Sequence, residues 1–382
     1  MNGPAFRLGL FYAAFFLIIG NLAAFWPVWM THRGLGPAEI GMVMAAASIC
    51  KALANPVLAH AADRSGERRR WIMLLAAAAF LAYLPFQWTH GFWPILVLHL
   101  VFFAAFSPTM PLVESLTMLG ARQQGLDYGR IRLWGSLTFI VAVTGGGLIL
   151  EGRSPEVIYW MMLAAVALTA LAALAVPDFR APPATQRGLP LGAAFRTTPG
   201  FVPFLAAAAL IQSAHAVYYG FGTLNWLRAG YSETVIGLLW AEGVVAEIGL
   251  FIIGTRVVRR WGPATLIAIG GAAGAVRWII SGLTDDLGIM FAVQLLHAIT
   301  FGATHLGAIH FIAERVKPEY SASAQSFYAV TVGGLAMGAA SFGAGFLYEA
   351  YAGRAYLAMA VLCVVGGCIA LTISRRPPAA AP

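Results

Sequence analysis

Long apolar runs follow one another along the whole chain, separated by short polar segments. Each run holds about 20 residues, the length that a helix needs to cross a bilayer core of about 30 Å. Barrel strands would be shorter and would alternate apolar with polar residues, whereas these runs are continuously apolar. The pattern predicts an all-α membrane protein with twelve transmembrane helices, over residues 7–30, 38–61, 71–88, 92–119, 128–150, 156–176, 200–228, 233–256, 263–283, 287–313, 321–348 and 355–374.

One long polar break interrupts this pattern at residues 177–199, where prolines are frequent and the apolar periodicity is lost. It predicts a cytoplasmic linker between an N-terminal six-helix bundle, residues 1–176, and a C-terminal six-helix bundle with a short tail, residues 200–382. The halves also resemble each other, because residues recur in order after 196 or 198 positions, such as His99 and Phe103, which recur as His297 and Phe301. Parallel six-helix repeats with a substrate site between them are a transporter architecture.

Basic residues are distributed unevenly between the predicted loops. With both termini placed in the cytoplasm, 18 of the 24 Lys and Arg residues fall on the cytoplasmic side, 4 fall on the opposite side and 2 lie within spans. Membrane proteins keep an excess of positive charge on the cytoplasmic side, so this orientation is predicted. The net charge of +8 is therefore a topology signal and does not indicate a nucleic-acid partner.

Composition supports the same class. Hydrophobic residues make up 60% of the chain and charged residues 10%, whereas soluble domains are nearer half apolar and a quarter charged. The three cysteines all fall within predicted helices, so no disulfide framework is expected. Asn-x-Ser/Thr sequons do not occur, and we expect a multi-pass protein of the bacterial cytoplasmic (inner) membrane.

The loop between the second and third predicted helices carries the sharpest motif. Residues 59–70 read Ala-His-Ala-Ala-Asp-Arg-Ser-Gly-Glu-Arg-Arg-Arg, which resembles the loop signature of the major facilitator superfamily, Gly-x-Leu-Ala-Asp-Arg-x-Gly-Arg-Arg. Asp63, Arg64, Gly66 and the run that begins at Arg68 match, while alanines replace the leading Gly and the Leu. The glycine permits a tight turn, and the aspartate can cap a helix or pair with an arginine of a neighbouring helix. Such a loop can gate conformational change; a plain basic loop is the alternative.

Further segments resemble the phenylpropionate permease group of this superfamily, which is related to the nucleoside and oligosaccharide proton symporters. They are residues 111–114, 127–136 and 296–305, and then Ala324-Gln325-x-x-Tyr328. The resemblance covers nearly the whole chain. It implies the major facilitator fold of two pseudo-symmetric six-helix bundles, and it implies proton-coupled uptake.

Ionisable residues inside the predicted spans make an independent argument. A charge at membrane depth costs several kcal/mol unless it is paired or hydrated, so each one is a candidate functional residue. The charged set is Lys51, Glu114, Glu242, Glu247 and Arg277, and the histidines within spans are His99, His215, His297, His305 and His310.

Depth along the helices suggests which groups pair. At 1.5 Å per residue, Glu242 lies about 14 Å and Arg277 about 9 Å from the outer ends of their helices, a gap that a long arginine can bridge. Glu114 and Arg132 both lie roughly 6–8 Å above the cytoplasmic ends of their helices. Glu242 and Glu247 point about 140° apart on one helix and are not expected to act as a carboxylate pair.

In lactose-permease-like symporters, glutamate–arginine pairs on helices 4/5 and 8/9, with a histidine on helix 10, bind substrate and move the proton. By this resemblance we expect the substrate and proton pathway to contain Lys51, Glu114, Arg132, Glu242, Glu247, Arg277, His297 and His305. Simpler interpretations stay open: an interfacial salt bridge for Glu114 and Arg132, an outward-snorkelling Arg277, and histidines that only stabilise helix packing, among which His215 is the weaker candidate for function.

These features favour a secondary active transporter that moves a small organic solute, such as 3-phenylpropionate, by alternating access and proton symport. Either Glu242 or Glu247 would carry the proton, and Arg277 or Arg132 would receive an anionic group. We expect a monomer whose partners are the substrate, protons and the lipid bilayer, with no cofactor and no metal. An exporter or a non-transporting sensor of the same fold are alternatives. An enzyme is disfavoured because Walker-type, His-Glu-x-x-His and Gly-x-Ser-x-Gly motifs are missing.

Overall fold

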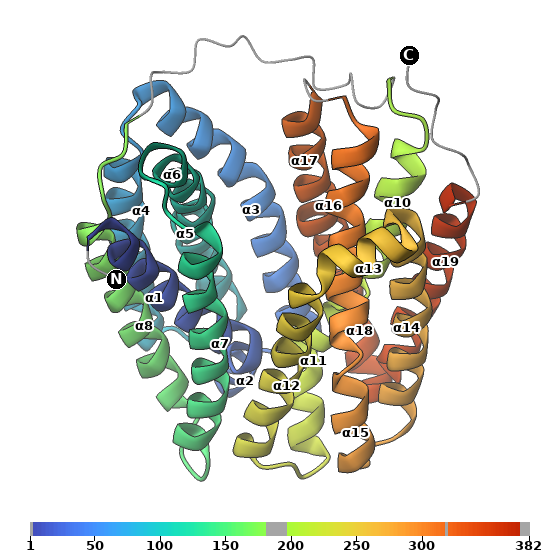
Figure 1. Cartoon of the computed structure of the whole chain (residues 1–382). Helices are drawn as coiled ribbons and strands as arrows, with labels where there is room; N and C mark the ends of the chain where they lie inside the picture. The colour runs from blue at the N-terminus through green and yellow to red at the C-terminus, as the bar shows by residue number, and fades with distance from the viewer. Residues whose placement is uncertain (1–2, 181–196, 318–319, 375–382) are drawn as a thin grey trace. The chain divides into compact units, whose positions relative to one another are not determined.

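The computed structural model describes residues 3–180, 197–317 and 320–374, and most of these residues are helical (Figure 1). Eleven helical stretches in this part of the chain are long and apolar enough to cross a membrane. The last, Ser323–Ile373, has 51 residues, which is more than two crossings need, and the short 3-10 helix η5 (Ala352–Ala355) interrupts it. The predicted all-α, twelve-helix membrane fold is therefore confirmed.

The chain divides into two compact units. Unit 1 is Met1–Thr185 with Trp226–Ala241, and unit 2 is Gln186–Asn225 with Glu242–Pro382. The predicted bundles, residues 1–176 and 200–382, stay a prediction. Most of the predicted linker, residues 177–199, lies outside the described residues.

Proline and glycine set many helix boundaries in unit 1. Pro27 stands in the first turn of its helix, and Gly66 ends another in the left-handed conformation at φ 69°. Gly20 allows close packing of the first helix, since an added Cβ would lie 2.7 Å from the Cβ of Ala142. The helices are α1 (Pro4–Ala24), α2 (Trp26–His32), α3 (Pro37–Ser65), α4 (Arg68–Tyr83), η1 (Leu84–Trp88), α5 (Phe92–Phe106), α6 (Thr109–Gln124), α7 (Tyr128–Leu150) and α8 (Glu156–Ala175), with the first part of α12 (Glu233–Ile252).

In unit 2, the helix Pro263–Leu283 packs closely against the helix Tyr356–Ser374. An added Cβ on Gly271 would lie 2.8 Å from the Cα of Gly367, so small residues let the two backbones approach. Besides the second part of α12, the helices are α10 (Phe201–Ser213), α11 (Ala216–Arg228, whose last residues belong to unit 1), α13 (Gly254–Trp261), α14 (Pro263–Leu283), α15 (Leu287–Gln294), η2 (Ala298–Ala303), α16 (Thr304–Arg315), α17 (Ser321–Val330), η4 (Thr331–Ala336), α18 (Met337–Tyr351), η5 and α19 (Tyr356–Ser374).

Several spans of unit 2 are interrupted within the membrane. The seventh is broken between α10 and α11, at Ala214 and His215. The tenth passes from α15 through the π-helix η2 before α16 begins, and the eleventh contains the π-helix η4. π-Helical turns are rare and occur frequently at functional sites. The breaks therefore direct attention to the residues around His215 and η2.

Apolar side chains also cover much of the outer surface of the helices. Leu53 and Val57 on α3 are each 67% exposed, and Ile252 on α12 is 79% exposed. Such side chains are stable facing lipid, and the helices satisfy their own backbone hydrogen bonds. The surface is that of a multi-pass membrane protein.

Candidate functional site

Arg277 on α14 is the best-buried charge of the described residues, with none of its surface exposed. Its Nη1 donates to Nδ1 of His297 at 3.0 Å and to Oγ1 of Thr300 at 3.0 Å. Its Nη2 donates to Oε1 of Gln294 at 2.8 Å. All three partners come from the interrupted tenth span, because the turn between α15 and η2 brings them to one side of Arg277. The guanidinium is thus held by neutral acceptors.

A carboxylate lies on the far side of His297. Oε2 of Glu247, on α12, is 3.6 Å from Nε2 of His297. Both side chains belong to unit 2 and are mostly buried, with 18% and 8% of their surfaces exposed. Glu247, His297 and Arg277 therefore form a continuous polar path from a carboxylate to a cation.

The break between α10 and α11 adds a second imidazole. His215, fully buried, has Nδ1 at 3.0 Å from the carbonyl oxygen of Gln212 and Nε2 at 3.2 Å from Oγ1 of Thr300. Thr300 thereby links His215 to Arg277. From the sequence, His215 was the weaker candidate, but its contacts place it inside the polar network.

Aromatic rings enclose the cation. The Cζ of Arg277 lies 4.7 Å from the ring centre of Tyr218 and 4.5 Å from that of Trp278, distances that favour cation–π attraction. The hydroxyl of Tyr218 in turn accepts a hydrogen bond from Nε2 of Gln294 at 3.1 Å. A planar guanidinium, polar acceptors and aromatic faces together suit a ligand that has both an anionic and an aromatic part.

The expected pair of Glu242 and Arg277 does not form, and that pairing hypothesis was wrong. Arg277 donates to the tenth span instead, and Oε2 of Glu242 is buried without a hydrogen-bond partner among the described residues. Depth along a helix carries no information on the direction in which a side chain points around the helix axis.

Glu114 and Arg132 also do not form an ion pair within 4.0 Å in the described part of the chain. The guanidinium of Arg132 lies 4.2 Å from the ring centre of Phe16 and 6.0 Å from that of Tyr12. Its Nη1 is buried without a hydrogen-bond partner among the described residues. Tyr12 lies within electrostatic range of both Glu114 and Arg132. The structure thus gathers these residues around an aromatic pair on α1, and the expected salt bridge is replaced by a cation–π contact.

The other expected pathway residues are found at separate places. His305 stacks on Phe301 with ring centres 6.1 Å apart, and Phe301 stacks on His297 at 5.4 Å. Parallel rings thus follow one face of η2 and α16. Lys51 is half-buried on α3, in unit 1.

The loop between α3 and α4 forms the expected turn. Gly66 has φ 69°, and Arg68, the first residue of α4, donates from Nε and Nη2 to Oδ1 of Asp63 at 3.0 and 2.7 Å. Of the two roles considered for Asp63, the structure shows the ion pair with the neighbouring helix. Arg64 is exposed.

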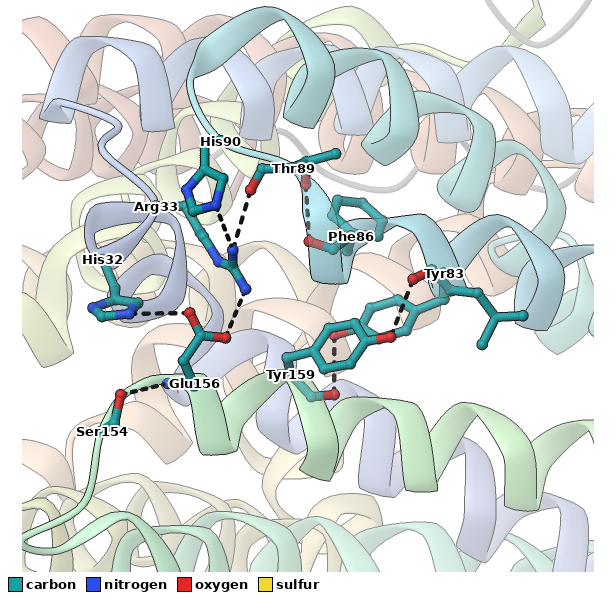
Figure 2. Close-up of polar contacts among 10 residues, drawn as sticks. His32, Arg33, Tyr83, Phe86, Thr89, His90, Ser154, Glu156 and Tyr159 are labelled. Carbon is teal, nitrogen blue, oxygen red and sulfur yellow. Dashed lines mark hydrogen bonds and ion pairs between the residues drawn. The ribbon is translucent and has the colours of Figure 1, made fainter.

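A second buried arginine, Arg33, lies in unit 1 directly after α2, and Figure 2 shows its polar contacts. Nη2 of Arg33 donates to Oε2 of Glu156 at 2.6 Å, and Oε1 of the same carboxylate lies 3.1 Å from Nε2 of His32. Nη1 of Arg33 is 3.0 Å from Nε2 of His90 and donates to the carbonyl of Thr89 at 3.4 Å. This cluster joins the end of α2, the segment before α5 and the start of α8.

Sequence reasoning missed Gln294, Thr300 and Arg33. The signal for Gln294 and Thr300 was available, since polar side chains one turn apart flank His297 within an apolar span. Arg33 was counted only as an outer-loop charge, and no local pattern shows that its side chain is 4% exposed.

Comparisons with known proteins give the same fold. A family model described as the MFS_1 like family matches residues 5–358. The "Probable 3-phenylpropionic acid transporter" of Escherichia coli (strain K12) is 32% identical over 365 residues, covering 94% of each chain. The maltose permease of Geobacillus stearothermophilus is 27% identical over 398 residues, covering 98% of each. The crystal structure of the nucleoside transporter NupG is similar with a TM-score of 0.85 at 17% identity, covering 99% of this chain and 100% of that one.

Proposed function

The chain belongs to the MFS_1 like family, and on that premise we propose that it carries a small organic anion into the cell together with a proton, by alternating access. Membership makes it a membrane transporter of the major facilitator type. We propose the substrate, the coupling ion and the direction of transport from the site described above.

One observation carries the proposal. Arg277 is completely buried, and its hydrogen-bond acceptors are the neutral groups of His297, Thr300 and Gln294. Burying a cation without a counter-ion is costly, and planar guanidinium groups bind carboxylates with two parallel hydrogen bonds. When Glu247 is neutral, an anionic substrate supplies the missing charge. Nε of Arg277 has no hydrogen-bond partner among the described residues, which leaves a donor for it.

An aromatic carboxylate such as 3-phenylpropionate fits this chemistry best. Tyr218 and Trp278 present ring faces beside Arg277, and aromatic pairs stabilise each other by stacking or edge contacts. The name of the 32% identical Escherichia coli relative refers to the same class of acid. Both facts support an aromatic acid over a neutral sugar.

The other predicted pathway residues keep their proposed roles. Glu247 and Glu242 are the candidate proton carriers, and Lys51, Glu114, Arg132 and His305 are further candidates for the substrate and proton pathway. Asp63 with Arg68 gates it, together with Arg64 and Gly66. We also propose that the protein acts as a monomer in the bacterial cytoplasmic membrane. The distribution of basic residues supports an orientation with both termini inside.

Uptake by proteoliposomes under an imposed proton gradient tests the proposal. A panel of radiolabelled aromatic carboxylates, nucleosides and disaccharides is offered with acid outside. We expect concentrative uptake of an aromatic carboxylate that a protonophore abolishes, and loss of that uptake in Arg277→Gln. Uptake of neutral solutes only, or uptake that Arg277→Gln leaves intact, would show that the proposed anion site is wrong.

The same vesicles separate the alternatives. An exporter accumulates solute only in vesicles of inverted orientation, whereas a sensor binds ligand in a thermal-shift assay but produces no flux in either orientation.

A further inference from the structure

We propose that Glu247 accepts the transported proton and that His297 is a neutral positioning residue, which Arg277 holds with its Nε2–H directed at Glu247. This inference rests on the proposed proton symport and assigns the proton within it. It narrows a pathway of several candidates to one carboxylate.

The ring of His297 has only one tautomer compatible with its neighbours. Arginine donates hydrogen bonds and cannot accept them, so Nδ1 of His297, 3.0 Å from Nη1 of Arg277, must present its lone pair. A neutral imidazole then carries its single proton on Nε2. That nitrogen is the one that lies 3.6 Å from Oε2 of Glu247. The imidazole therefore donates toward the carboxylate.

This tautomer excludes a second proton on His297 as long as the contact with Arg277 persists. An imidazolium donates from both nitrogens, and its Nδ1–H would face the cationic Nη1 at 3.0 Å. Protonation of His297 would thus bring two positive charges together in a buried place. Carriage of a proton by this ring requires the Arg277 contact to break first.

The second imidazole is held differently. Nδ1 of His215 faces the carbonyl of Gln212, which only accepts, so the neutral ring carries its proton there. Its Nε2 faces the hydroxyl of Thr300, which can donate to it and which accepts from Arg277. A second proton on His215 would place another positive charge in the buried surroundings of Arg277, to which Thr300 links it.

Glu247 is the group of this path that can gain and lose a proton without placing a positive charge near Arg277, because a carboxyl group is either neutral or negative. Two titratable groups face it, His297 from the tenth span and Tyr219 from α11, and Glu242 stands on its own helix. An ionised Glu247 compensates the charge of Arg277 through the ring of His297. Once a proton from water neutralises Glu247, the cation needs another counter-ion, and the carboxylate of the substrate provides it. The proton and the anion thereby enter together.

Two substitutions and two measurements test this assignment. Glu247→Gln removes the titrating group and keeps the size. His297→Gln retains an acceptor for Arg277 and a donor for Glu247 but cannot hold a transported proton. Each variant is reconstituted and assayed for proton-driven accumulation and for counterflow exchange of labelled against unlabelled aromatic carboxylate, the substrate identified with the wild type.

We expect Glu247→Gln to exchange substrate but to lose accumulation, so that the internal concentration does not exceed the external one. We expect His297→Gln to accumulate substrate under a proton gradient, at a lower rate. Accumulation by Glu247→Gln, or exchange without accumulation by His297→Gln, would overturn the assignment. If wild-type vesicles show no flux of any solute, the proposed function fails, which is a different result.

Binding measurements cover the case in which a variant folds but does not exchange. Quenching of tryptophan fluorescence by substrate is titrated at pH 6 and pH 8. The wild type and His297→Gln should bind more tightly at the lower pH, and Glu247→Gln should bind equally at both. A pH-independent His297→Gln would contradict the proposal.

Discussion

Gln294 accepts a hydrogen bond from Arg277 at 2.8 Å, so a neutral amide occupies the place beside the guanidinium where a carboxylate would cancel its charge. The same amide donates to Tyr218 at 3.1 Å. These two contacts hold the side chain in one orientation, with its oxygen toward the cation. The neutrality of residue 294 is therefore central to the proposed selectivity for anions.

Gln294→Glu is expected to abolish uptake of the anionic substrate. The new carboxylate would pair with Arg277 and repel the carboxylate of the substrate, and like-charge contacts cost several kcal/mol, which corresponds to a loss of more than about tenfold in affinity. Uptake kinetics in proteoliposomes measure the effect. Gln294→Met is the uncharged control: it removes both hydrogen bonds named above and adds no charge, whereas Gln294→Glu keeps an acceptor for Arg277 and loses only the donor to Tyr218. Equal defects in both variants would refute the charge argument.

Transport of a monovalent carboxylate is expected to be electroneutral. One proton on Glu247 and one anion beside Arg277 leave the summed charge of the site unchanged. A potassium diffusion potential without a pH difference should therefore drive no accumulation, while a pH difference without a potential should. Accumulation driven by the potential alone would show that a further charge moves with the substrate.

Gly147→Ala is expected to impair transport strongly. A Cβ at Gly147 would collide with the carbonyl of Glu233, where α7 and α12 approach within unit 1. The helices would have to separate, and overpacking of this kind typically costs about 1–3 kcal/mol. Gly145→Ala is the control on the same helix, because nothing lies within 4 Å of its added Cβ. Thermal stability and uptake of the two variants should differ; identical behaviour would mean that this close approach has no importance.

Glu156→Leu is expected to lower the stability of the purified protein. It would leave Arg33, whose side chain is 4% exposed, without its counter-ion (Figure 2). Hydrogen bonds to charged groups contribute about 1.5–3 kcal/mol, and the partial exposure of Glu156 favours the lower end. Thermal unfolding in detergent measures the shift. Glu67→Leu removes a mostly exposed pair with Arg70 and should change stability by less than about 1 kcal/mol.

The sequence by itself determined the class of the protein and much of its chemistry. Runs of apolar residues fix membrane-spanning helices because the bilayer leaves the backbone no other partners. The motif around Asp63 indicated the superfamily. Glu247, Arg277 and His297 were identified as candidates because ionisable groups in spans are rare and costly. All of these inferences depend only on the type of each residue and on its position along the chain.

Only the tertiary structure decided which of these groups meet. Arg277 donates to Gln294 and His297 rather than to Glu242, and the depth of these residues along their helices does not show which of them face one another. Arg33 became a buried residue because Glu156, distant by 123 positions, folds onto it. The direction of a side chain around its helix and the contacts between distant segments depend on how the helices pack. The pattern of residues along the chain does not determine that packing.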